Sequence, residues 1–104
     1  MHTRLASALI MSLCGPLFAD VVVQGSRAVL DHAQALYNDR ADVARGREAM
    51  VLWDSVLKDD PANYEALWKL ARAHWWLATY GSPQAGDVEK LAIFEKGIAW
   101  AKLA

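Results

Sequence analysis

Apolar residues recur at intervals of three and four positions along most of the chain after residue 25. This period is typical of helices that bury one face. Three polar stretches interrupt the pattern, "NDRAD", "KDDP" and "GSPQAG". Four helices joined by short connections are therefore expected. No segment alternates apolar and polar residues over a useful length, so the chain is predicted to be all-α, without a sheet.

Residues at the predicted helix ends have side chains that such positions prefer. Ser26 is the expected N-cap of the first helix, which runs to about residue 38. Asp60 and Pro61 suit the start of the third helix, with the aspartate as cap and the proline in the first turn. That helix is expected to end at Gly81, and Asp87 is expected to cap the fourth.

The third helix, within "NYEALWKLARAHWWLA", is apolar on two sides. At about 100° per residue, the stripe expected to face the core contains Leu67, Leu70, Ala71, His74, Leu77 and Ala78. Another side of the same helix carries Glu65, Trp68, Arg72, Trp75 and Trp76. Arg72 lies one turn from Trp68 and from Trp76, so its guanidinium can stack on an indole ring.

The junction between the second and third helices resembles the junction between two tetratricopeptide repeats. The positions that match the repeat pattern are, in order, Ala49, Trp53, Val56, Pro61, Leu67, Leu70 and Ala71. The small residues among them let helix backbones approach, and the larger ones fill the gaps. The resemblance implies antiparallel helical hairpins stacked as a short TPR-like solenoid over residues 26–104.

By this resemblance, one side of the third helix would line a concave groove that binds a protein or an extended peptide. The predicted groove residues are Glu65, Trp68, Arg72, Trp75 and Trp76. The alternative is that Trp68 and Trp75 pack against a neighbouring hairpin and contact no ligand. Trp53 and Trp100 are assigned to packing.

A second, narrower resemblance implies a different ligand. The phrases "WKLARA" and "EKGI" are similar to those of the periplasmic T component of TRAP transporters, and also to eukaryotic regulators of microtubule dynamics. The first resemblance implies an accessory solute-binding component whose groove or pore holds a small organic anion with an apolar body. A signal peptide argues against the second.

The amino-terminal residues have the organisation of a signal peptide. Arg4 precedes a short apolar run, and the small residue Ala19 follows it, so residues 1–19 are expected to be removed and the chain exported to the periplasm. Residues 20–25 would form a connector. The single cysteine, Cys14, lies inside the predicted signal peptide, and lipid attachment there is a less favoured alternative.

Composition and motifs argue against several classes of function. The formal net charge is -1, with 11 Lys and Arg against 12 Asp and Glu and no basic cluster, so a nucleic-acid partner is not expected. No phosphate loop, paired-cysteine zinc spacing or calcium loop occurs, so neither a metal nor a cofactor is expected. His74 lies on the core stripe with no Ser, Asp or Cys at a catalytic spacing, and we therefore expect no enzyme.

The fourth predicted helix ends in "IAWAKLA", without a glycine, a proline or a polar cap. Its apolar stripe would lack cover, and repeat arrays need about three units for stability. The array is therefore expected to continue in a longer protein, or this uncapped helix to dock on a partner or on a second copy as a homo-oligomer. Gly97, inside the helix, costs about 1 kcal/mol relative to Ala unless a neighbouring helix needs the space.

Overall fold

The structure is a computed structural model that describes residues 25–104. Its elements are a first helix over residues 25–38, α2 (Val43–Asp59), α3 (Tyr64–Trp76), the π-helical continuation η1 (Leu77–Gly81) and α4 (Asp87–Leu103). No strand occurs within the described range, so the all-α prediction is confirmed there. The predicted signal peptide, with Cys14, lies outside the described residues, as does the predicted connector apart from residue 25, which is already helical.

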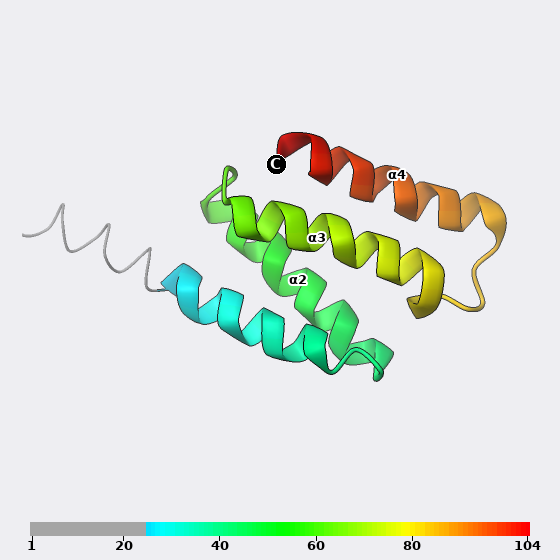
Figure 1. Cartoon of the computed structure of the whole chain (residues 1–104), viewed down its shortest axis with the longest axis horizontal. Helices are drawn as coiled ribbons and strands as arrows, with labels where there is room; N and C mark the ends of the chain where they lie inside the picture. Colours follow the sequence, from blue (N-terminus) through cyan, green and yellow to red (C-terminus); the bar gives the residue numbers. More distant parts are fainter. Residues whose placement is uncertain (1–24) are drawn as a thin grey trace, which may run out of the picture.

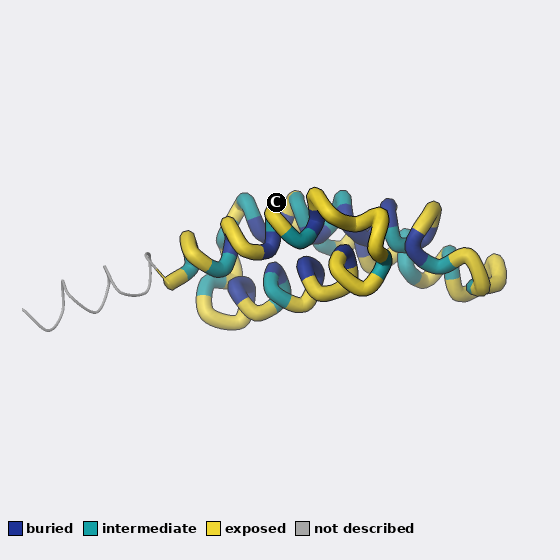
Figure 2. Tube along the Cα trace, turned by 90° about the horizontal axis from the view of Figure 1, so that it is seen from below, coloured by how far each residue is buried: buried dark blue, intermediate teal, exposed yellow. Residues whose placement is uncertain are grey.

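Successive helices run in opposite directions, and α3 lies in the middle of the arrangement (Figure 1). α4 packs along one side of α3, and α2 packs on α3 from the other side together with the first helix. Buried residues lie mainly on the helix faces that meet one another, and the outer faces are exposed (Figure 2). α3 is thus covered along its core stripe, whereas Trp68 and Trp75 on its other apolar side stay partly exposed.

The predicted cap of α3 is wrong, because Asp60 belongs to the end of α2. The backbone N–H of Asp60 donates to the carbonyl of Val56, and the proline that follows disfavours a helical conformation at this residue. The N-cap of α3 is Asn63, whose side chain accepts a hydrogen bond of 3.0 Å from the backbone N–H of Ala66. Pro61 therefore lies in the turn between the helices and not in the first turn of α3.

Two further caps differ from the prediction. Gly86 is the N-cap of α4 and makes no side-chain hydrogen bond, so Asp87 is the first helical residue. A carboxylate there still stabilises the helix, since it lies beside the positive end of the helix dipole. Ser26 is inside the first helix, because residue 25 is already helical. The predicted end of the third helical segment at Gly81 is confirmed, although its last turn is π-helical.

Aromatic rings form the centre of the core. Trp53 is fully buried, and its ring centroid lies 5.3 Å from that of Tyr37. The Tyr37 ring also meets the edge of Trp76, with centroids 6.0 Å apart. Because each large aromatic in a core contributes about 3–5 kcal/mol, these rings account for much of the cohesion between the first helix, α2 and α3. The packing roles predicted for Trp53 and Trp100 are confirmed, the latter being partly buried against this core.

Gly97 lets α4 approach α3 closely. A Cβ atom at this position would lie 2.9 Å from the Cβ of His74 and 3.2 Å from the carbonyl oxygen of Ala71. Neither of these atoms belongs to a flexible side-chain end, so a larger residue would push the helices apart. The glycine is the one buried residue of α4, and the neighbouring helix α3 needs the space that a side chain would fill.

His74 is an interior residue, as the sequence indicates. Its side chain is buried, and Nδ1–H donates a hydrogen bond of 2.8 Å to the backbone carbonyl of Leu70. Burial lowers the pKa of His74 below 6.5, and the nearby Lys96 acts in the same direction. The imidazole is therefore neutral at pH 7 and serves as part of the contact between α3 and α4.

Candidate ligand-binding groove

A hollow of about 620 Å³ lies between the first helix, the turn after it, and α3. We call it the groove. Its lining residues are Gln34, Tyr37, Asn38, Arg40, Ala41, Val43, Arg72, Trp75, Trp76 and Tyr80. The set combines aromatic rings, two side-chain amides and two arginines. No carboxylate is among the described residues that line it.

Both arginines stack on aromatic rings at the groove wall. The Arg72 guanidinium carbon lies 4.4 Å from the ring centroid of Tyr37 and 5.0 Å from that of Trp68. The guanidinium carbon of Arg40 lies 4.5 Å from the Tyr37 centroid. The predicted stacking of Arg72 on an indole is thus confirmed for Trp68. Stacking of this kind fixes the orientation of the planar cations and leaves their charge uncompensated.

No carboxylate pairs with either groove arginine within residues 25–104. Arg40 donates a hydrogen bond of 3.1 Å to the carbonyl of Tyr37. Nε and Nη2 of Arg72 are buried and have no hydrogen-bond partner. An unsatisfied buried donor is costly, and more so on a charged group. Two guanidinium groups without a carboxylate partner among the described residues thus lie at the groove, and Nη1 is the Arg72 nitrogen left for a ligand.

The structure brings together three of the five predicted groove residues. Arg72, Trp75 and Trp76 line the groove. Trp75 is 53% exposed, whereas Trp76 is only 5% exposed and forms part of the inner wall against the core. Trp68 is 38% exposed and reaches the groove only through its stacking on Arg72.

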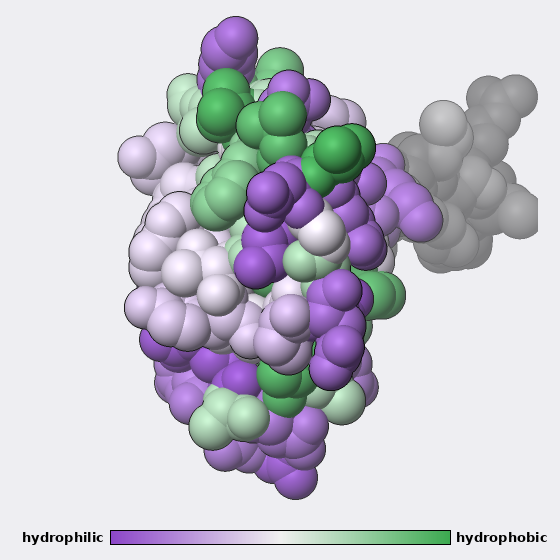
Figure 3. Space-filling view, turned by 90° about the vertical axis from the view of Figure 1, so that its right-hand side faces the viewer, coloured by the Kyte–Doolittle hydropathy of each residue, from purple (hydrophilic) through white to green (hydrophobic). Residues whose placement is uncertain are grey.

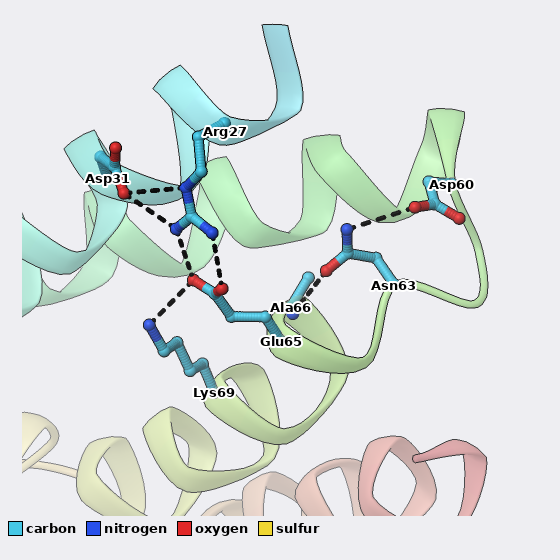
Figure 4. A network of polar contacts seen from close by, with 7 residues as sticks. All are labelled: Arg27, Asp31, Asp60, Asn63, Glu65, Ala66 and Lys69. Carbon is cyan, nitrogen blue, oxygen red and sulfur yellow. Dashed lines mark hydrogen bonds and ion pairs between the residues drawn. The ribbon is translucent and has the colours of Figure 1, made fainter. Parts of the chain in front are cut away.

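Glu65 lies outside the groove lining and takes part in an ion-pair network (Figure 4). Its two carboxylate oxygens accept hydrogen bonds of 2.9 Å each from Arg27 on the first helix. Lys69 donates another, also of 2.9 Å. Hydrogen bonds from Arg27 lower the pKa of Glu65 to about 2. The carboxylate thus ties the first helix to α3 at a distance from the groove residues.

The first helix and η1 supply groove residues that sequence reasoning missed. Tyr37 shares the helical spacing of the apolar residues before it, which is typical of a core residue, and Arg40 lies in the polar stretch "NDRAD", which predicts only a break between helices. Tyr80 joins the groove because the wider π-helical turn of η1 brings its ring to the edge of Trp75, with centroids 5.8 Å apart. A signal was present in the aromatic and basic character of "ALYNDR", but pairing it with α3 requires the tertiary structure.

Comparisons of the chain with known protein families, with curated proteins and with solved structures find no match. Within residues 25–104, no helix combines the length and the apolar character needed to cross a membrane.

Proposed function

We propose that this chain is an exported binding scaffold of the tetratricopeptide type, whose groove takes an extended acidic segment of a partner protein. The observation that carries the proposal is the pair of arginines, Arg40 and Arg72, held against aromatic rings without a carboxylate partner among the described residues. Export is proposed from the signal-peptide pattern of residues 1–19.

The origin of the groove walls supports hairpin stacking. In tetratricopeptide arrays, by the resemblance given above, the first helix of each hairpin lines the concave face. Here the groove lies between the first helix and α3, which are the opening helices of two successive antiparallel pairs. The matched positions Ala49 and Trp53 are fully buried where the pairs meet, as close helix packing requires.

The chemistry of the groove supports an acidic ligand. A guanidinium N–H donates a charge-assisted hydrogen bond to a carboxylate, and such bonds are about twice as strong as neutral ones. The indole of Trp75 is half exposed beside the arginines and offers an apolar surface to the rest of the ligand. Large aromatic side chains with one exposed face are frequent anchors of protein recognition.

The size of the groove favours a second candidate, in which it holds a small organic anion as part of a transporter. Its volume of about 620 Å³ falls within the range of small-molecule pockets, about 300–1,000 Å³. The same two arginines would bind the carboxylate of such a solute. This function would match the narrower resemblance to the TRAP component.

The proposal is tested by titration of the purified chain with two peptides of equal length, while tryptophan emission is followed. One peptide contains two adjacent glutamates, and the other has glutamines in their place. We expect the acidic peptide to bind at least about 10-fold more tightly, since it alone can form charge-assisted bonds with the arginines. Small mono- and dicarboxylates form a third series that tests the transporter function.

Arg72→Gln should remove most of this preference while the helical circular dichroism is retained. Arg45→Gln is the matched control, because Arg45 is exposed and pairs with Asp39 and Asp42 outside the groove. Equal binding of both peptides, or an unchanged preference in Arg72→Gln, would refute the proposal. Tight binding of a small carboxylate with no binding of the acidic peptide would favour the second candidate.

A further inference from the structure

Trp75 separates the groove from a second hollow on the neighbouring face of the protein. The second hollow has a volume of about 220 Å³ and lies between α3 and α4. Its lining residues are Ala71, Trp75, Phe94, Gly97, Ile98 and Ala101. Because Trp75 lines both hollows and is half exposed, a ligand that leaves the groove across this indole reaches the second hollow directly.

The second hollow is apolar throughout. Every lining residue is hydrophobic or a glycine, and Gly97 lies where α4 approaches α3 closely. Ile98 is 54% exposed although its side chain is a large aliphatic one. Hydrophobic side chains also gather over α4 in the upper part of the end-on view (Figure 3). Such a surface gains free energy when another apolar group covers it.

The two hollows together fit a ligand that is negatively charged at one end and apolar at the other. The groove contains two arginines, and neither hollow is lined by a carboxylate. The complementary ligand has carboxylates that pair with Arg40 and Arg72, and a large apolar group that passes Trp75 and covers Ile98.

Side-chain amides in the groove favour a peptide over a lipid-like anion. Gln34 donates a hydrogen bond of 2.7 Å from Nε2 to Oδ1 of Asn38. This leaves the Gln34 oxygen as an acceptor and the Asn38 amino group as a donor on residues that line the groove. An acceptor and a donor side by side suit the N–H and C=O groups of a peptide backbone, which a lipid-like anion lacks.

We infer that the ligand is a peptide segment in which acidic residues are followed within a few positions by large apolar residues, and that the apolar part is seated between α3 and α4. This inference rests on the proposed function, because it extends the same groove. It adds a specificity that the arginines alone cannot provide, since they would accept any acidic sequence.

The test compares two acetylated, amidated peptides that share an acidic pair, Glu-Glu-Gly-Leu-Phe and Glu-Glu-Gly-Ser-Ser, in titrations of the full chain. We expect the first to bind at least about 10-fold more tightly, since partial burial of two apolar side chains is worth that much. Ile98→Gln should abolish the difference between the peptides and leave the affinity for the second unchanged. Leu91→Gln is the matched control, because Leu91 is a similarly exposed aliphatic residue of α4 outside the hollow.

The outcomes separate this inference from the proposed function. If both peptides bind equally, or if Ile98→Gln keeps the difference, the inference is wrong, while a preference for glutamate over glutamine still supports the acidic groove. If octanoate binds more tightly than Glu-Glu-Gly-Leu-Phe, the ligand is a lipid-like anion and the peptide assignment fails. If no acidic ligand of either kind binds, the proposed function fails as well.

Discussion

Neutralising the carboxylate of Glu65 should weaken the attachment of the first helix to α3 by an amount that the structure allows us to work out. Glu65→Gln keeps the size of the side chain and removes the charge that accepts from Arg27 and Lys69. The lowering of the Glu65 pKa from 4.5 to about 2 corresponds to at most about 3 kcal/mol. Because the Arg27 and Glu65 side chains are 52% and 27% exposed, solvent screening reduces the expected loss to about 1 kcal/mol.

The lowered pKa of Glu65 also determines how the effect of Glu65→Gln on stability changes with pH. The pKa of Glu65 is lower in the folded state, so its contribution is fully present above pH 4.5 and is lost as pH falls from there towards 2. The free energy of unfolding of Glu65→Gln should therefore be about 1 kcal/mol below that of the parent at pH 7. The difference between the two proteins should shrink as the pH is lowered through this window.

Urea unfolding followed by far-ultraviolet circular dichroism, at a series of pH values from 7 to 3, measures this difference. Glu48→Gln is the matched control, because Glu48 is exposed and forms no ion pair within the described residues. Its effect should stay within about 0.5 kcal/mol. A loss in Glu65→Gln that is no larger than in the control, or that is the same at pH 7 and pH 3, would refute the role assigned to the network.

Three further predictions concern packing, titration and capping, each measured by urea or thermal unfolding. Gly46→Ala should destabilise by about 1–3 kcal/mol, since the added methyl would overlap the Trp76 ring, while Gly25→Ala, with open space around it, should not; equal effects would contradict this packing. Because the pKa of His74 is lowered in the folded state, its contribution to the free energy of unfolding is fully present above pH 6.5 and is lost as the pH falls below that value, so His74→Leu should reduce this loss. An unchanged pH dependence in His74→Leu would show that other groups cause it. Asn63→Ala should cost about 1 kcal/mol by removing the N-cap of α3, and no loss would mean that the cap is replaced by solvent.

The number and order of the helices could be predicted from the sequence, and their ends less well. Periodic apolar residues mark helices because side chains three and four positions apart share a face. The caps at Asp60 and Asp87 were misassigned, since Asp is also favourable in a turn and in a first helical turn. Asn63 was the better cap of α3, but the choice between two nearby polar residues depends on where the turn after α2 ends.

The groove was predictable only in part. Arg72 and Trp75 were correctly placed on one side of α3, because their spacing fixes that relation within a single helix. Glu65 lies on the same side by spacing, yet it bonds to Arg27, which is 38 positions away in sequence. Tyr37 belongs to both the core and the groove, since its ring packs on Trp53 and both guanidinium groups lie over it.

By itself, the sequence determined the helices of residues 25–104, the apolar stripes they bury, and the grouping of indoles with a guanidinium on α3, because all of these depend on local spacing. Only the tertiary structure decided that Arg40 joins Arg72 across Tyr37, that Glu65 ties two helices together, and that Gly97 is needed for close approach. These features depend on which side chains meet across helix interfaces, and such contacts arise from the packing of whole helices, which no spacing within one helix specifies.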